Sequence, residues 1–251
     1  MAQHTEQLRS LHLFAGAGGG LLADLLLGHR TIGAVEIEEY PRNVLLQRQR
    51  DGILPEFPIW DDVRSFDGKP WRGHVDIVAG GFPCTNISCA GDGTGLGGKE
   101  SSLWFDMARV IGEVQPRFVF VENSPLLVSR GLNRVLSDLA SMGYDARWGV
   151  IGFGDAGGNH QRNRLWIVAT ANGVQERGEG EWDEAVARFD RVSWCQDVGG
   201  GEDVRNRFDL PEPVLLRSRN DVANYVDRTE AIGNGQIPAV AALAWRVLGG
   251  G

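Results

Sequence analysis

Cysteine is scarce in this chain, whose 251 residues include only Cys84, Cys89 and Cys195. No two of them form a CxxC pair, and an odd number of cysteines cannot complete a disulfide framework. We therefore expect reduced thiols in a cytoplasmic protein and no bound metal.

Long apolar runs are also lacking. The longest are Leu21–Leu27, which Asp24 interrupts, and Ala239–Trp245, whereas a membrane-spanning helix needs about 20 apolar residues. The first ten residues are polar and do not resemble a signal peptide. The sequence therefore predicts no membrane span, and we expect the protein to act as a monomer.

Basic residues are outnumbered, with 25 Lys and Arg against 33 Asp and Glu and a formal net charge of -8. An acidic chain is repelled on average by nucleic-acid phosphates, but a local basic patch can still bind them. The candidates for such a patch are the arginines at positions 162, 164, 205, 207, 217, 219 and 228. For any single arginine, a solvated position beside neighbouring acids is an equally good interpretation.

What the chain does have is an alternation of short apolar runs with helical patterns. Strands are predicted at Leu11–Ala15, Ile32–Ile37, Val75–Ala79, Phe118–Val121, Trp148–Phe153 and Leu165–Ala169. Helices are predicted at Gly20–Leu27, Pro41–Arg50, Ser102–Val114, Leu132–Met142 and Ile237–Leu248. This order predicts an α/β fold with a doubly wound, mostly parallel sheet. The alternation stops after Thr170, so we assign residues 1–170 and 231–251 to one domain and residues 171–230 to a small irregular module.

Cys84 follows the apolar run Val75–Ala79, in the segment GGFPCTNIS at Gly80–Ser88. Pro83 restricts the backbone before the cysteine, and the glycines let the backbone approach a ligand. Buried structural thiols more often lie inside a strand or helix. On this segment alone, a catalytic thiol and a structural thiol are equally good interpretations.

A glycine-rich turn, Phe14–Gly20, follows the first predicted strand and leads into a helix. Backbone N–H groups at such a junction can approach a ligand. Glu36 ends the second strand about 20 residues later, where a carboxylate can accept hydrogen bonds from ribose hydroxyls. Leu21 stands where the dinucleotide pattern requires glycine, so the combination indicates an adenosine-type cofactor without a pyrophosphate.

Further polar residues lie at strand ends. Glu122 ends an apolar strand, at the edge of a parallel sheet where ligands bind. Arg162 and Arg164 alternate before the strand Leu165–Ala169, so both can point the same way. A salt-bridged surface pair is the alternative for these arginines, and the segment Ile232–Pro238 before the last helix is a turn and cap on the simplest interpretation.

In this order the motifs closely resemble the cytosine-5 DNA methyltransferase family, over Leu11–Ala169 and Ala231–Leu248. The matching elements are FAGxGG at Phe14–Gly19, the acidic strand end at Glu36, GGFPC at Gly80–Cys84, Glu122–Ser124, the RxR of Arg162 and Arg164, and GNxxxP at Gly233–Pro238. The chain departs from the family's usual residues at Thr85, Ser124, His160 and Gly235, positions that flank the residues implied to carry the chemistry.

The resemblance implies a Rossmann-like methyltransferase that uses S-adenosyl-L-methionine and acts on double-stranded DNA. Its catalytic residues would be Cys84, Glu122, Arg164 and Arg162. Its cofactor-binding residues would be Phe14, Ala15, Gly16, Gly18, Gly19, Glu36, Ile37, Asp62, Val63, Pro83, Leu103 and Asn234. A bacterial or phage-encoded restriction–modification protein, associated with DNA in the cytoplasm, is the implied setting.

In the implied reaction, the Cys84 thiolate adds to C6 of a cytosine flipped out of the duplex and makes C5 nucleophilic. Glu122 would hold the base edge, and Arg164 would orient the base and Glu122. Residues 89–99, with five glycines, would close over DNA. Residues 171–230 would read the DNA sequence through base-edge contacts.

Three alternatives stay open. An RNA cytosine-5 methyltransferase would use the same pocket, although Ser124–Leu126 does not supply the Cys-Phe-Thr signature of that branch. A nonenzymatic DNA-binding relative would lose the nucleophile, whereas Cys84 and Glu122 are both present. A dehydrogenase is disfavoured by Leu21.

Overall fold

A computed structural model describes residues 7–83, 102–158, 162–174 and 235–249. Their strands form one seven-stranded sheet in the order β3-β2-β1-β4-β5-β7-β6. The strands are β1 (Arg9–Leu13), β2 (Arg30–Val35), β3 (Ile59–Trp60), β4 (Ile77–Gly80), β5 (Phe118–Asn123), β6 (Tyr144–Ile151) and β7 (Arg164–Ala171). The helices are α1 (Gly19–Leu27), α2 (Glu39–Arg50), the 3-10 helix η1 (Lys69–Trp71), α3 (Ser102–Val114), α4 (Leu127–Arg130), α5 (Leu132–Ser141) and α8 (Pro238–Leu248).

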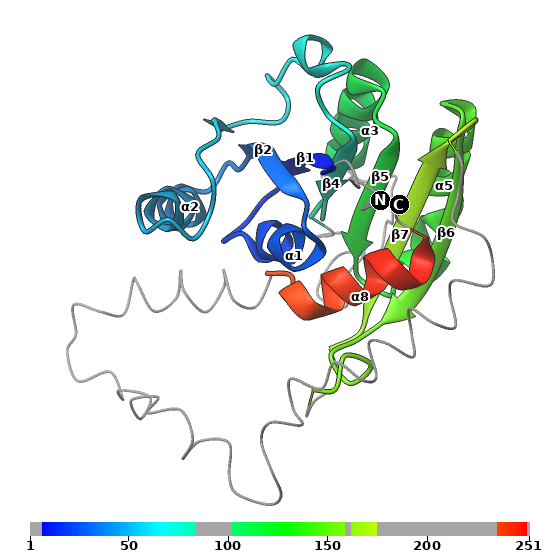
Figure 1. The fold of residues 1–251 in the computed structure, drawn as a ribbon. Helices are drawn as coiled ribbons and strands as arrows, with labels where there is room; N and C mark the ends of the chain where they lie inside the picture. The colour runs from blue at the N-terminus through cyan, green and yellow to red at the C-terminus, as the bar shows by residue number, and fades with distance from the viewer. Residues whose placement is uncertain (1–6, 84–101, 159–161, 175–234, 250–251) are drawn as a thin grey trace, which may run out of the picture.

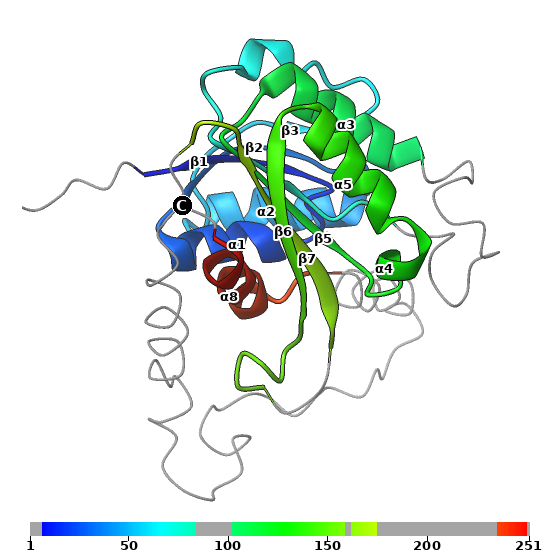
Figure 2. The same ribbon diagram turned by 90° about the vertical axis from the view of Figure 1, so that its right-hand side faces the viewer.

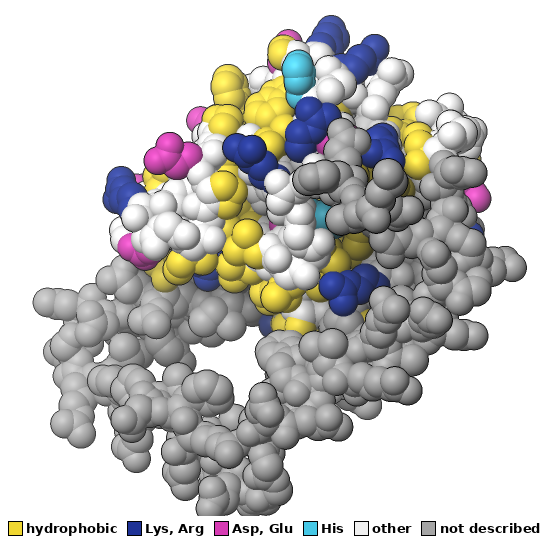
Figure 3. All heavy atoms as spheres, viewed as in Figure 1, with side chains coloured by type: hydrophobic (Ala, Val, Ile, Leu, Met, Phe, Trp, Pro, Cys, Tyr) yellow, Lys and Arg dark blue, Asp and Glu magenta, His cyan; other side chains and the backbone are white. Residues whose placement is uncertain are grey.

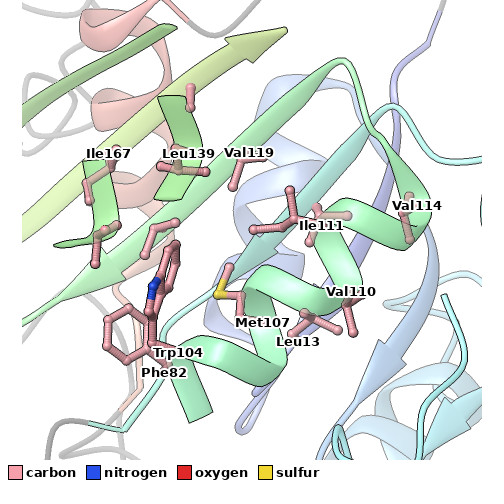
Figure 4. Packing of buried hydrophobic residues seen from close by; sticks show 14 of the residues in the cluster. Leu13, Phe82, Trp104, Met107, Val110, Ile111, Val114, Val119, Leu139 and Ile167 are labelled. Carbon is pink, nitrogen blue, oxygen red and sulfur yellow. The ribbon is translucent and has the colours of Figure 1, made fainter. Parts of the chain in front are cut away.

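Helices cover both faces of the sheet (Figures 1 and 2). Successive side chains of a strand point to opposite faces, and in β5 Val119 and Val121 belong to one core cluster while Phe118 and Phe120 belong to the other. The first cluster contains Trp104, Met107, Val110, Ile111 and Val114 of α3, and Figure 4 shows these side chains packed against Leu13, Val119 and Leu139. An apolar strand with two buried faces is the pattern expected of a doubly wound sheet.

The second cluster is built around α8. Its buried residues Val240, Ala241, Ala244 and Trp245 pack with side chains of β4, β5 and β7 on the face of the sheet opposite to α3. The rings of Trp245 and Phe120 are nearly perpendicular, with 5.3 Å between their centroids. Helix α8 lies beside α1 in both views (Figures 1 and 2), so the end of the chain returns to the first helix.

The predicted doubly wound, mostly parallel sheet is confirmed, with corrections at its edges. Strand β7 runs antiparallel to both β5 and β6. Residues 152–163 join β6 to β7 without a helix among those that the structure describes, whereas a parallel neighbour is usually reached through a crossover helix. Strand β6 begins at Tyr144, whereas the sequence predicted a start at Trp148. The first residues of the strand were missed because several side chains of this edge strand are exposed or half-buried, which hides the apolar pattern of a strand.

Three short elements, β3, η1 and α4, were not predicted from the sequence. Most of the predicted module, residues 175–230, and the predicted closing loop, residues 89–99, lie outside the described residues. On the face drawn in Figure 3, the Lys and Arg side chains of the described residues are dispersed among apolar and acidic ones and do not form one continuous basic patch. No helix in the described part of the chain is long and apolar enough to cross a membrane.

Candidate active site

The carboxyl ends of β2, β1, β4 and β5 lie side by side in the sheet. The residues that follow them therefore meet at one edge, which is where open α/β sheets bind ligands. Phe14 follows β1, Glu36 follows β2, and Gly81 follows β4, while Glu122 lies just before the last residue of β5. Most of the residues predicted to be functional are brought together in this way.

The turn between β1 and α1 has an unusual backbone. Phe14 has φ 53°, Gly16 φ 53° and Gly18 φ 88°, and a positive φ is rare for a residue with a side chain. Gly18 is the N-cap of α1. A Cβ built at Gly16 would meet nothing within 4 Å, so open space borders the turn at this residue.

Glu36 is fixed against this turn. One carboxylate oxygen, Oε2, accepts a hydrogen bond from the backbone N–H of Gly16 at 2.6 Å, and Oε1 accepts one from the N–H of Glu38 at 2.8 Å. The Arg42 side chain donates to the backbone carbonyls of Glu36 and Ile37. The two hydrogen bonds therefore hold the Glu36 carboxylate in one orientation, and Glu36 is buried. The side chain of the next residue, Ile37, is half exposed.

The remaining predicted cofactor residues differ in what they present. Asp62 binds Arg64 in an exposed ion pair at 2.9 Å, which lowers the pKa of Asp62 through hydrogen bonds. The Val63 side chain is buried in the core. Its backbone carbonyl accepts a hydrogen bond from Arg109 Nη2 at 2.7 Å. Leu103 is partly buried against the same core.

Trp60 was missed by the sequence analysis. It ends β3, its carbonyl accepts the backbone N–H of Glu36 at 2.9 Å, and about half of its side chain is exposed. An exposed tryptophan at a strand end beside an oriented carboxylate offers an aromatic face to a ligand. The signal in the sequence was the short apolar pair Ile59–Trp60, which is too brief to read as a strand.

Glu122 is a second buried acid at this edge of the sheet. Burial raises the pKa of its carboxyl group, and the charge of Arg164, a hydrogen bond from Gln236 and the charge of Arg162 partly offset this effect. Arg164 Nε lies 2.9 Å from Glu122 Oε1. A Cβ at Gly81 would lie 2.6 Å from Glu122 Oε2, so the residue after β4 has no room for a side chain.

The two predicted arginines have different partners. Arg164 meets Glu122, whereas Arg162 donates from Nη2 to the backbone carbonyl of Gly235 at 2.7 Å. Both line a small cavity with Trp166, Gln236 and other residues of this edge. Arg162 therefore ties the segment before α8 to the site, a contact that the sequence analysis did not predict.

The backbone before Cys84 is also fixed. Asn123 Nδ2 donates to the carbonyl of Phe82 at 3.1 Å, and the buried Phe82 ring packs on Trp104 at 5.4 Å between centroids. The exposed Pro83 follows directly. Cys84 and Asn234 lie outside the described residues, so their predicted roles stay predictions.

Comparison with known proteins decides the family. The model of the C-5 cytosine-specific DNA methylase family matches residues 8–208. The chain belongs to this family.

Among curated relatives of this family member, the type II methyltransferase M.CviJI of Paramecium bursaria Chlorella virus IL3A is 34% identical over 163 residues, which are 64% of this chain and 42% of the relative. M.Eco47II of Escherichia coli is 31% identical over 187 residues, 71% of this chain and 43% of the relative. The chain thus spans less than half the length of these two relatives. A solved Spodoptera frugiperda DNMT2 mutant has a TM-score of 0.56 at 15% identity, covering 69% of this chain and 53% of that one, which is a likeness of fold.

Among the described residues of this family member, no cluster of three or more His, Cys, Asp or Glu side chains could hold a metal ion. The polar groups at the sheet edge include instead the Glu36 carboxylate, which accepts a hydrogen bond from the β1–α1 turn, and the Glu122 carboxylate, which is paired with Arg164. Gln236, which bonds to Glu122, was not singled out from the sequence. Its only signal was its position in the GNxxxP motif at Gly233–Pro238.

Proposed function

We propose that this protein transfers a methyl group from S-adenosyl-L-methionine to C5 of cytosine in duplex DNA, with Cys84 as the nucleophile. The observation that carries the proposal is the buried Glu122, paired with Arg164 at the exit of β5. In a C-5 cytosine-specific DNA methylase family member, this carboxyl group lies one strand away from the segment that leads to Cys84.

The residues of the β1–α1 turn fit the proposed cofactor. The open space at Gly16 leaves room for a ligand beside the backbone, and Glu36 presents an oriented carboxylate that suits ribose hydroxyls. Ile37 and Trp60 expose apolar side chains beside it, which suit an adenine ring. When bound, the cofactor supplies an electrophilic methyl group on a sulfonium centre.

The chain's own residues would act on the base. The Cys84 thiolate forms a bond to C6 and pushes electron density onto C5, which is otherwise a poor nucleophile. Glu122 holds the N3 and amino edge of the base, and its raised pKa suits a carboxyl group that shares a proton with N3. Arg164 keeps Glu122 in place. Once C5 has bonded to the methyl group, with S-adenosyl-L-homocysteine as the leaving group, loss of the C5 proton to a base allows the C6–sulfur bond to break and frees the cysteine.

DNA in which 5-fluorocytosine replaces cytosine tests this chemistry without knowledge of the target sequence. Fluorine at C5 cannot leave as a proton, so the adduct cannot eliminate and the protein stays covalently joined to the DNA. We expect a denaturant-stable adduct that requires S-adenosyl-L-methionine in the wild type. Cys84→Ala should form none, while Cys89→Ala and Cys195→Ala should form it normally.

Matched RNA separates the nearest alternative, because a pocket for a flipped cytosine admits either sugar. Transfer of labelled methyl groups to RNA but not to DNA would assign the other substrate. An adduct formed by Cys84→Ala would show that the nucleophile is wrong. Cofactor binding by Cys84→Ala, measured by calorimetry, should match the wild type because the described cofactor edge is built from other residues.

A further inference from the structure

Gln236 lies where the cofactor turn and the buried acid meet. A Cβ at Gly19 would be 2.0 Å from the backbone carbonyl oxygen of Gln236, and one at Gly20 would be 2.6 Å from its side-chain Oε1. A Cβ at Gly81 would be 3.5 Å from its Nε2. One residue therefore packs its backbone on the start of α1 and directs its amide toward the strand ends.

The amide of Gln236 is hydrogen-bonded to the Glu122 carboxyl group. Arg164 Nε already lies 2.9 Å from Oε1 of that group, while Oε2 faces Gly81, as does Nε2 of Gln236. The carboxylate is thus held from two sides by donors on different elements. A carboxylate held in this way has one orientation in the site.

The segment that carries Gln236 is itself anchored. Arg162 binds the carbonyl of Gly235 at 2.7 Å, and Pro238 begins α8 two residues after Gln236. The residues Ala239–Trp245 of this helix are all buried. The amide is therefore presented from a fixed backbone, which is what a positioning group requires.

We propose that Gln236 is a positioning residue, whose amide N–H holds the Glu122 carboxyl group in the orientation that meets the base. This inference rests on the proposed function. The charged groups that act on Glu122 among the described residues are Arg164 and Arg162, at and just before β7. Helix α1 and the end of β4 present glycines there, and from β1 the His12 ring lies on the Gln236 side, since a Cβ at Gly20 would be 2.6 Å from Gln236 Oε1 and 3.1 Å from His12 Nδ1.

Gln236→Met tests the amide, because it keeps the length of the side chain and removes the donor. A donor to the charged form of a carboxyl group lowers its pKa, so loss of the donor should move the Glu122 titration to higher pH. We expect kcat to fall by roughly 10- to 150-fold, the size of one hydrogen bond to a charged group, with the KM for the cofactor nearly unchanged. The backbone contact with Gly19 survives this substitution.

Gln236→Glu is the converse variant. It keeps size and shape, but a second carboxylate beside Glu122 disfavours the charged form, so the titration should move further upward. Activity should be lost mostly at high pH and recovered in part as the pH is lowered, because the introduced carboxyl group can donate a hydrogen bond once it is protonated. The upward shift follows from the added charge alone, so the recovery at low pH is the diagnostic effect: a residue that acts only through packing would show no such recovery.

Two readouts on the full chain keep the inference separate from the proposed function. The first is the pH dependence of kcat and KM for methyl transfer. The second is carbon-13 NMR of carboxyl-labelled glutamates, with the Glu122 signal assigned through Glu122→Gln, which needs no activity. The matched control is Gln47→Met, since Gln47 is an exposed glutamine on α2 that donates to Asp51.

We expect the Glu122 signal to titrate at higher pH in Gln236→Met than in the wild type and in Gln47→Met. Coincident NMR titrations, or coincident pH profiles in an active enzyme, would overturn the positioning role of Gln236. The wild type could also fail to transfer methyl groups to DNA while the Glu122 signal still titrates at higher pH in Gln236→Met. That result would support the contact between Gln236 and Glu122 and overturn the proposed function.

Discussion

Asp24 is a buried acid in α1 that holds the first strands of the sheet together. Its Oδ2 accepts hydrogen bonds from Ser10, from His12 Nε2 at 2.8 Å and from Thr31 Oγ1 at 2.7 Å, and His29 Nδ1 lies 3.6 Å from Oδ1. All of these side chains are buried. Asp24→Ala would leave three groups of β1 and β2 without their shared acceptor.

The expected loss is large because none of these groups can turn to water. Removing one partner of a buried, hydrogen-bonded charge pair costs roughly 3–5 kcal/mol. Alanine is the best helix former, so helix propensity does not add to the loss. For a chain of this size each 1 kcal/mol lowers Tm by about 2–4 °C, which gives a fall of roughly 6–20 °C.

The effect should depend on pH in a defined direction. Burial alone would raise the pKa of Asp24, but the attraction of His12 and hydrogen bonds from His12, His29 and Ser10 hold it well below the ordinary value of 3.8. A carboxyl group with a lowered folded-state pKa stabilises the fold above its unfolded-state pKa and loses that contribution as the pH falls. The wild-type advantage over Asp24→Ala should therefore be full at pH 7 and shrink below about pH 4.

Urea unfolding followed by circular dichroism, at pH 7 and at pH 3–4, measures both quantities. Asp51→Ala is the control, because Asp51 is an exposed residue at the end of α2 that accepts only from Gln47 among side-chain donors in the described structure. It should change the free energy of unfolding by no more than about 0.5 kcal/mol. Equal stability of Asp24→Ala and the wild type at pH 7 would refute the argument.

Two further predictions concern the proposed reaction. Glu122→Gln keeps the size of the side chain and removes its ability to deliver or share a proton, so methyl transfer measured with labelled cofactor should fall by roughly two to four orders of magnitude while the protein stays folded. An unchanged rate would mean that the carboxyl group has only a structural role. Exchange of residues 171–230 for the equivalent region of a relative should change the methylated DNA sequence, read by methylation-sensitive sequencing, without abolishing transfer. A chimera that methylates the original site would place specificity in the remaining domain.

The parts of the fold that could be predicted from sequence are those with local patterns. The apolar runs of β1, β2, β4, β5 and β7 are buried on both faces, so composition alone marks them. Because parallel strands end at a common edge, naming the polar residue after each run, such as Glu36 or Glu122, was enough to assemble most of the described site. The edge strand β6 was misplaced because half of its side chains face away from the core.

The contacts that escaped prediction join residues far apart in the chain. Gln236 reaches Glu122 only because α8 returns to pack beside α1, and no local pattern encodes that return. Asp24 was visible only as a polar interruption of an apolar helix. Its partners Ser10, His12 and Thr31 lie on two strands, and the sequence does not show that three short polar side chains share one acceptor.

The glycines of the β1–α1 turn show why a motif alone does not assign roles. Gly16 has a positive φ and a Cβ there would meet nothing, so its freedom serves the backbone and leaves space for a ligand. Gly19 has an ordinary φ, and a Cβ there would collide with the backbone carbonyl of Gln236 at 2.0 Å. Its missing side chain therefore makes room for the end of the protein's own chain. Gly20 and Gly81 are constrained in the same way, by Gln236 and Glu122. Gly19, which was predicted to bind the cofactor, thus also lets the β1–α1 turn pack against the segment before α8, and Gly20 and Gly81 leave room for the side chains of Gln236 and Glu122.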